Sequence, residues 1–390
     1  MTTKVALYSA VGEELTHYDV DVDALTLTKR KSIKVPAVVQ YAWPHPKKHT
    51  LYVTTSNRGK GMKSDYNHVS ALRIDPASGE LSYHGDPVKL PARAVHLCLT
   101  ADAQYLLNAH NLPHAGITVH RINADGTLGA EVKQPDSLAF GIYPHQVMAA
   151  PSTGTVMLID RGNDAKKDQP EDPGALRQFR INNDGVLANL AATAPNGGYG
   201  FGPRHLDFHP TQPWVYVSLE RQDKLYMYRM QGNGLESAAA YIRETLMDPA
   251  NVRPRQLAGT IHVHPNGRCV YLINRSDSTV EYQGKAVFGG GDNSIAVYAI
   301  DQKTGEPTLI QHADTHTFHS RTFAIDPSGR MMVVASNLPM DVREGEKVVT
   351  VPATLSVLRV GDDGKLAFVR KYDVETDGKI HYWMGMFGLN

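Results

Sequence analysis

One phrase recurs six times along this chain and limits its fold more than any other feature. Each copy is a short apolar strand, a tight turn that is often centred on proline, and a second apolar strand, as in residues 39–46 and 51–55. Successive copies begin roughly 50 to 60 residues apart, a spacing typical of the four-stranded repeats of a β-propeller. The copies begin at Val39, Val95, His145, Arg204, Ile261 and Arg321.

A second phrase follows each copy and supplies the remaining two strands. It is an alternating strand, a glycine turn and a nearby leucine, which is the pattern of a β-hairpin. We therefore expect each repeat to hold four antiparallel strands, A to D. The glycine turns are Ser78-Gly79, Asp125-Gly126, Asp184-Gly185, Asn233-Gly234, Thr304-Gly305 and Asp363-Gly364.

The two chain ends each carry part of a seventh repeat. Residues 5–9, 15–20 and 25–28 have the pattern of strands B, C and D with no strand A before them, and residues 380–387 have that of a lone strand A. Pairing the ends removes the exposed sheet edges of an open array. The sequence therefore predicts an all-β fold, a single seven-bladed β-propeller domain over residues 1–390. An open solenoid is the alternative, which the split repeat and the absence of polar capping repeats disfavour.

Candidate functional residues follow from two positions that open on the same mouth of a propeller channel, the start of strand A and the end of strand B. Four arginines fall at these positions, and buried guanidinium groups are costly unless anions compensate them. We expect an anionic ligand there; the alternative is that each arginine pairs with a neighbouring carboxylate. The strand A positions are Gln40, Val95, His145, Arg204, Gly259 and Arg321, and the strand B positions are Ser56, Asn111, Arg161, Glu220, Arg275 and Asn337.

Four long segments follow strand B and are expected on this same face. Long loops on one face of a repeat fold are typical of its binding side. The segments are residues 58–68, 162–174, 280–292 and 338–352.

Composition disfavours several other classes of protein. The chain holds 40 Lys and Arg against 40 Asp and Glu, so no net charge draws it to nucleic acid or to an anionic membrane. No apolar run is long enough to cross a bilayer, and the first residues lack the apolar core of a signal peptide, which favours the cytoplasm. We expect a monomer or a weak homo-oligomer. Cys98 and Cys269 are expected to be separate buried thiols, with a disulfide as the alternative.

A metal site is the main chemical competitor. His262 and His264 alternate along a strand and point to opposite faces, so they cannot chelate one ion together. His312, His316 and His319 precede a strand and could converge, but without a positioned carboxylate. We expect neither a metal nor another cofactor.

The strongest motifs resemble those of the seven-bladed propeller lactonases, a family that includes propeller-type bacterial 6-phosphogluconolactonases and the fungal carboxymuconate cyclase. The matching stretches are residues 143–145, 202–205, 208–210, 216–220 and 263–275, of which Gly202-Pro203-Arg204-His205 with Glu220 downstream is the most specific. The resemblance implies a catalytic set of His145, Glu220, Arg204 and Arg275. The chain departs from the family pattern at residues 101–103, where a Pro-Asp-Gly turn is usual, and in the length of the segments after Arg161 and Val280.

These residues suit the opening of an anionic lactone by direct attack of water. His145, expected to titrate near neutral pH, and Glu220 are the acid and base candidates, while Arg204 and Arg275 suit an oxyanion or a carboxylate. The chain has no Gly-x-Ser-x-Gly nucleophile elbow, which disfavours an acyl-enzyme. Cycloisomerisation of an unsaturated diacid is one alternative, and a non-catalytic interaction propeller is another. The remaining expected substrate-binding residues are Arg321, Arg161, Asn111, Asn337, His205 and His381.

Overall fold

The computed structural model describes residues 4–59, 64–151 and 154–389, and nearly all of its regular structure is antiparallel sheet. The segments named in the sequence as strands A and B form the inner strands of seven sheets, the blades. Blades 1 to 3 hold the first third of the chain and its last strand. Blade 1 is β34 (His381–Gly388), β1 (Val5–Val11), β2 (Glu14–Asp21) and β3 (Thr26–Lys34); blade 2 is β4 (Val39–Pro44), β5 (Thr50–Ser56), β6 (Asn67–Ile74), β7 (Leu81–Tyr83) and β8 (Val88–Lys89); blade 3 is β9 (Arg93–Leu99), β10 (Tyr105–Leu112), β11 (Gly116–Ile122) and β12 (Leu128–Val132).

Blades 4 to 7 hold the rest of the chain. Blade 4 is β13 (Pro144–Ala149), β14 (Thr155–Asp160), β15 (Ala175–Ile181) and β16 (Leu187–Thr193), followed by a 3-10 turn (Pro195–Gly198); blade 5 is β17 (Pro203–Phe208), β18 (Trp214–Leu219), β19 (Lys224–Gln231), β20 (Gly234–Leu235) and β21 (Tyr241–Glu244). Blade 6 is β22 (Gln256–Val263), β23 (Cys269–Ser276), β26 (Ser294–Ile300) and β27 (Pro307–Asp314); blade 7 is β28 (Ser320–Ile325), β29 (Met331–Ser336), β32 (Ala353–Val360) and β33 (Leu366–Val374).

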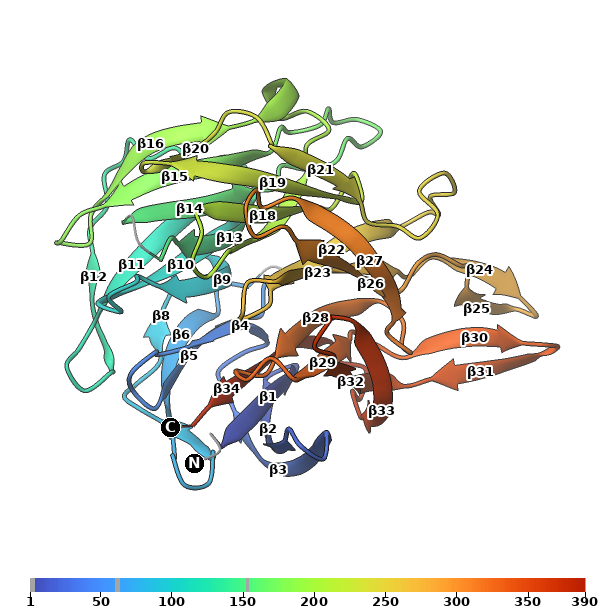
Figure 1. The fold of residues 1–390 in the computed structure, drawn as a ribbon. Coiled ribbons are helices and arrows are strands. Elements are labelled where there is room, and N and C mark those ends of the chain that lie inside the picture. Colours follow the sequence, from blue (N-terminus) through green and yellow to red (C-terminus); the bar gives the residue numbers. More distant parts are fainter. Residues whose placement is uncertain (1–3, 60–63, 152–153, 390) are drawn as a thin grey trace.

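The first strands of the blades form a closed ring. Each packs against the first strand of the next blade, in the order β4, β9, β13, β17, β22, β28, β34 and back to β4. The blades follow one another in chain order, so that the last strand, β34, lies beside the first, β1 (Figure 1). This arrangement confirms the predicted seven-bladed β-propeller.

The predicted closure by the chain ends is also confirmed. Strand β34 pairs antiparallel with β1, with Trp383 opposite Ala10 and Met384 opposite Ser9. Trp383 and Met384 are both buried, the former against blade 2 and the latter against blade 7. The C-terminal strand therefore joins three blades through one set of side chains.

The recurring glycine turns tie each blade to its neighbour. The Tyr216 hydroxyl in blade 5 donates a hydrogen bond to the Gly305 carbonyl of blade 6 at 2.9 Å, and Tyr8, Tyr52 and Tyr271 make the same contact to Gly79, Gly126 and Gly364. Gly305 has a φ of +78°, and an added Cβ would lie 2.4 Å from Met227. Glycine therefore repeats here because the turn needs both a left-handed backbone and room for the neighbouring blade.

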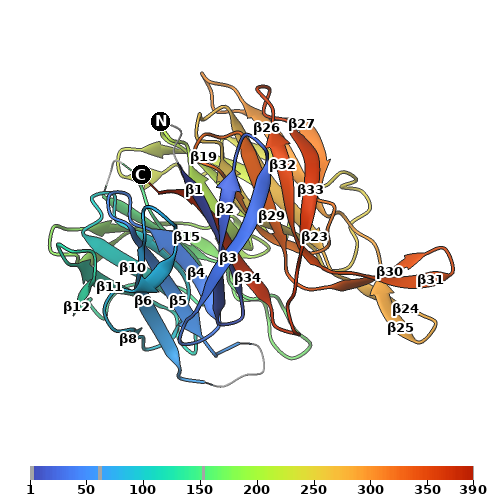
Figure 2. The same cartoon turned by 90° about the horizontal axis from the view of Figure 1, so that it is seen from below.

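Two of the four segments expected as loops are instead β-hairpins. Residues 280–292 contain most of the hairpin β24 (Thr279–Tyr282) and β25 (Lys285–Phe288), and residues 338–352 contain β30 (Met340–Glu344) and β31 (Lys347–Val351). The hairpins extend from the ring side by side (Figures 1 and 2), and the Arg343 guanidinium lies 4.3 Å from the Tyr282 ring centroid. Alternating strand residues and tight turns account for the difference.

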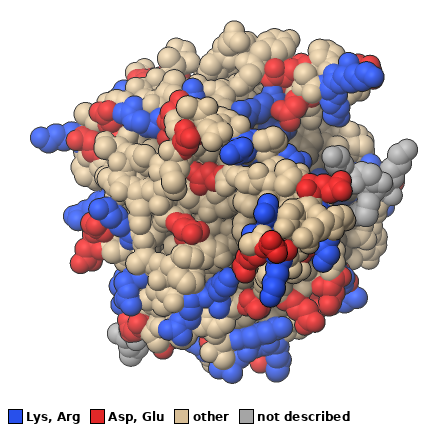
Figure 3. Space-filling view, turned by 90° about the vertical axis from the view of Figure 1, so that its right-hand side faces the viewer, with Lys and Arg blue, Asp and Glu red and all other residues tan. Residues whose placement is uncertain are grey.

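Surface charge is mixed on the side that carries these hairpins, where Lys and Arg are interspersed with Asp and Glu (Figure 3). Within the described ranges, no helix is long and apolar enough to span a bilayer. Cys98 and Cys269 are both free and buried, which confirms the prediction of two thiols.

Candidate active site

A β-bulge near the start of each inner strand builds the mouth of the channel. In β17, Pro203 pairs with Leu219 and His205 with Ser218, so Arg204 has no opposite residue in the ladder. A bulge turns the extra residue away from the ordinary alternation of a strand, and bulges are common beside active sites. The extra residues of the seven blades are Tyr382, Gln40, Val95, His145, Arg204, the pair Gly259 and Thr260, and Arg321.

All of these bulged residues except Gly259 line one small cavity. Its volume is about 20 Å³, room for a single water molecule. Every blade contributes to its wall, and His205 lines it as well. The six strand A positions counted from the sequence are all bulge positions, whereas Tyr382, the seventh, was missed.

Glu220 is the centre of an ion cluster beside this cavity. Arg204 Nε donates to Glu220 Oε1 at 2.8 Å, and Arg275 donates to the same oxygen. Arg161 donates to the other oxygen, so blades 4, 5 and 6 meet at one carboxylate. The alternative of arginines paired with carboxylates therefore holds in part, but three guanidinium groups share one negative charge.

The cluster sets the protonation of Glu220. Burial raises the pKa of this carboxyl, but the charges of Arg161, Arg275 and Arg204 outweigh burial and hold the pKa well below its usual range. A carboxylate stabilised in this way is a poor base, because a proton must compete with three cations. Glu220 is better suited to holding the arginines in place.

The histidines at the mouth are neutral at physiological pH. Burial and the charges of Arg204, Arg161 and Arg321 lower the pKa of His145 well below its usual value, and burial and Arg204 do the same for His205. The expectation that His145 titrates near neutrality therefore fails, because the imidazole is buried and lies near cations. His145 Nδ1 is buried without a hydrogen-bond partner among the described residues.

Two arginine donors remain free for a ligand. Arg204 Nη1 and Arg275 Nε are buried and donate to no acceptor in the described part of the chain. A Cβ on Gly259 would lie 3.4 Å from Arg275 Nε, so the glycine leaves space beside this donor. Such preorganised donors suit an oxyanion or a ligand carboxylate.

Tyr382 and Arg93, from blades 1 and 3, form a second polar cluster at the cavity. Arg93 Nη2 donates to the Tyr382 hydroxyl at 2.6 Å and Arg93 Nε to Gln40 Oε1 at 2.8 Å. The Arg321 guanidinium lies 4.0 Å from the Tyr382 ring centroid. Burial raises the pKa of Tyr382, but Arg321, Arg93 and Arg204 outweigh it and lower the pKa to about 8.

Comparison with known proteins identifies the family to which this chain belongs. Residues 2–342 match the family model described as lactonase, seven-bladed β-propeller. The chain belongs to the seven-bladed β-propeller lactonase family. It is 25% identical over 372 residues to a 6-phosphogluconolactonase of Bacillus subtilis, covering 90% of this chain and 95% of the relative, and 26% identical over 309 residues to one of Pectobacterium carotovorum, covering 79% and 80%.

Solved structures share the fold. The periplasmic gluconolactonase of Pseudomonas aeruginosa superposes with a TM-score of 0.71 at 20% identity, covering 99% of this chain and all of that one. A protein from Lactobacillus plantarum gives a TM-score of 0.68 at 19% identity, with 99% of each chain covered.

Not every residue expected at the site of this lactonase-family protein lies in the cavity wall. Arg161, Glu220 and Arg275 stand beside the cavity through the ion cluster. Asn111 is buried at the end of β10, and Asn337 follows β29; neither lines the cavity. His381 is fully buried, bonded to Ser9 Oγ at 2.7 Å, because the bulge at Tyr382 turns these two neighbours to different sides.

The three histidines considered for a metal do not converge. His312 Nε2 is bonded to the Thr245 carbonyl, His316 packs on Phe368, and His319 Nε2 lies 3.1 Å from Arg275 Nη1. Across the residues that the structure describes, no three His, Cys, Asp or Glu side chains gather to hold a metal ion.

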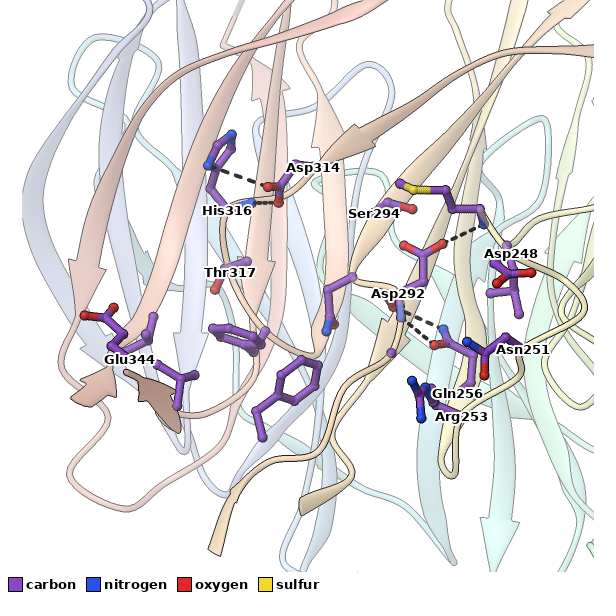
Figure 4. A pocket seen from close by; sticks show the side chains of 18 of the residues that line it. Asp248, Asn251, Arg253, Gln256, Asp292, Ser294, Asp314, His316, Thr317 and Glu344 are labelled. Atoms are coloured by element: carbon purple, nitrogen blue, oxygen red, sulfur yellow. Dashed lines mark hydrogen bonds and ion pairs between the residues drawn. The ribbon is translucent and has the colours of Figure 1, made fainter. Parts of the chain in front are cut away.

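The two most voluminous of the cavities described lie outside this mouth. One, of about 580 Å³, is an apolar funnel at the opposite end of the channel, and it shares Tyr41, Thr322 and Trp383 with the mouth cavity. The other, of about 660 Å³, lies by the hairpins, where Asp292 is bonded to Gln256 (Figure 4). Its wall carries four carboxylates, Asp248, Asp292, Asp314 and Glu344, against two cations, Arg253 and Lys371, so its acidic groups outnumber its basic ones.

Proposed function

We propose that this protein is a lactonase that hydrolyses an anionic lactone by direct attack of water. The observation that carries the proposal is the excess of positive charge at the mouth. Five arginines from five blades gather there: Arg93, Arg161, Arg204, Arg275 and Arg321. Glu220 contacts three of the five, Arg161, Arg204 and Arg275.

The geometry supports separate roles for the arginines. Arg204 and Arg275 are fixed by Glu220 and keep free N–H groups, which suit the oxyanion that forms when water adds to the lactone carbonyl. Arg321 faces the cavity without a carboxylate partner among the described residues, so it suits the anionic substituent of the substrate. The neutral His145, whose Nδ1 has no partner among the described residues, is available to hold the attacking water in place.

The names of the relatives suggest the substrate class. Because relatives over most of the chain are 6-phosphogluconolactonases, we propose a sugar-acid lactone bearing a phosphate or a carboxylate. We also keep the predictions that the chain is one domain, acts in the cytoplasm, and is a monomer or weak homo-oligomer.

A panel of lactones tests the function. Purified protein is incubated with phosphorylated, carboxylated and neutral sugar-acid lactones, and separately with a muconate-type diacid, in water labelled with heavy oxygen, and the uncatalysed rate is subtracted. Hydrolysis places one labelled oxygen in the product carboxylate. Conversion of a muconate-type diacid without label indicates cycloisomerisation instead, and an absence of turnover with every substrate leaves a binding propeller.

A further inference from the structure

The last bulged residue of the ring, Tyr382, carries chemistry that the proposed function has not used. It is the second residue of β34. A bulge in this strand, equivalent to the bulges at His145 and Arg204 in their own blades, turns it into the cavity. Tyr382 therefore lines the same small cavity, with room for a single water, as His145, Arg204 and Arg321.

The hydrogen bond at Tyr382 differs from those of the structural tyrosines. Tyr216 donates its hydroxyl hydrogen to the Gly305 carbonyl, as expected of a buried phenol that stabilises the fold. Tyr382 instead accepts from Arg93, and its own hydrogen meets no acceptor among the described residues. The hydroxyl is thus held at its oxygen while its proton is free to leave.

Three cations, each from a different inner strand, surround this phenol. Arg93 comes from β9, Arg321 from β28 and Arg204 from β17. The other groups of the cavity wall do not offset them, because Gln40 of β4 is uncharged, and burial and nearby charges keep His145 of β13 and His205 of β17 neutral. Such a site stabilises the phenolate and lowers the pKa of the phenol.

The alternative bases are weaker candidates. Both oxygens of Glu220 are hydrogen-bonded to arginines. Burial and neighbouring cations lower the pKa of the His145 imidazole, which makes it a weak base. General base catalysis is most efficient when the pKa of the base lies near the working pH, which the value of about 8 for Tyr382 satisfies.

We propose that Tyr382, as a phenolate held by Arg93 and Arg321, is the general base that removes a proton from the attacking water. This inference rests on the proposed lactonase function. The water oxygen bonds to the lactone carbonyl carbon, and one water proton passes to the Tyr382 oxygen. When the ring C–O bond breaks, Tyr382 returns that proton to the leaving alkoxide. The new carboxylic acid then ionises to solvent, so Tyr382 ends as it began.

The test compares pH profiles of kcat/KM for the wild-type protein and Tyr382→Phe, which keeps the ring on which Arg321 stacks. For the wild type, kcat/KM should rise about tenfold per pH unit and level off above about pH 8. Tyr382→Phe should lose about a hundredfold or more in kcat and lose this limb. Tyr216→Phe, the matched control, should lower thermal stability slightly and keep both the rate and the limb.

A second variant and an optical titration guard against misfolding of Tyr382→Phe. Arg93→Gln removes the donor to the phenolate and should shift the limb to higher pH. The near-ultraviolet absorbance of the wild type should show one tyrosine ionising near pH 8 that is absent from Tyr382→Phe. An active wild type with no such ionisation, or a Tyr382→Phe protein that keeps the limb, overturns the inference alone. A wild type that opens no lactone overturns the proposed function, and the role of Tyr382 with it.

Discussion

Arg204 and Glu220 lie 16 residues apart in one blade and are joined by a buried hydrogen bond of 2.8 Å from Arg204 Nε to Glu220 Oε1. Arg161 and Arg275 reach the same carboxylate from the blades on either side. One acidic side chain therefore stabilises three blades at the mouth of the channel as well as the donors proposed to bind substrate.

Replacing Glu220 with Gln should destabilise the fold rather than only slow the reaction. The change leaves three buried guanidinium groups without their anion, and breaking a buried ion pair typically costs about 3–5 kcal/mol. Chemical denaturation measures the free energy of unfolding. Glu244→Gln is the control, because its pair with Lys224 is half-exposed and contributes only about 0–1 kcal/mol. Equal effects of the two changes would contradict the structural role of Glu220.

The same cluster predicts sensitivity to acid. The pKa of Glu220 is lower in the folded protein than in the unfolded chain, so its contribution to stability is complete above the unfolded value of about 4.3 and is lost as pH falls below it. The stability difference between wild type and Glu220→Gln should therefore shrink as pH is lowered through this range. A difference that stays constant down to strongly acidic pH would argue against ionised Glu220 as its source.

Arg321 should discriminate between charged and neutral ligands. Replacing it with Gln removes a cation at the cavity wall, and loss of a charge-assisted hydrogen bond costs about 1.5–3 kcal/mol, or about tenfold to a hundredfold in affinity. Calorimetry with the open-chain product acid measures Kd without involving the chemical step. Arg330→Gln, which alters an exposed pair with Asp23 away from this cavity, should leave Kd unchanged. The prediction fails if a neutral analogue is weakened as much as the acid.

The fold and the strand A mouth positions of six blades, which the structure shows to be bulges, could be predicted because both depend on local patterns. Strand alternation and glycine turns set the blade, and the distance from the A–B turn to the bulge is the same in each copy. Blade 1 lacks that turn, since its strand A is the end of the chain, so no anchor was available from which to count. His381 was chosen in place of Tyr382, an error of one residue that changes the side of the strand.

Interactions between distant segments were beyond prediction. Arg93 and Tyr382 lie 289 residues apart, and Arg93 stands two positions before Val95, the bulged residue of its strand. No periodicity links two such residues. The low basicity of Glu220 was hidden for the same reason, because two of its three arginines come from other blades.

Closure of the ring by β34 should control the stability of the whole fold. Deleting residues 379–390 exposes the paired edge of β1 and removes Trp383 and Met384 from the cores of two neighbouring blades. We expect the truncated chain to have a markedly lower Tm and to lose cooperative unfolding. Calorimetry and near-ultraviolet circular dichroism measure both. Replacing residues 342–349 at the tip of the β30–β31 hairpin with a short glycine linker is the control, because this hairpin lies outside the seven blades. A truncated chain that unfolds at the wild-type Tm would show that blade 1 closes without β34.

The contact between Tyr216 and Gly305 gives a test of blade-to-blade packing that leaves the mouth intact. Gly305→Ala adds a methyl group 2.4 Å from Met227 and 2.7 Å from Trp214, on a backbone whose φ of +78° already disfavours alanine. Gly345→Ala is the matched control, because that glycine has a φ of +63° but nothing within 4 Å of an added Cβ. Both changes carry about 1–2 kcal/mol of backbone strain, and overpacking adds about 1–3 kcal/mol to Gly305→Ala alone. Chemical denaturation should therefore show the larger loss for Gly305→Ala, while kcat/KM of the folded protein stays close to that of the wild type in both. Equal losses would mean that the neighbouring blade yields to the methyl group and that the glycine is required only by the turn.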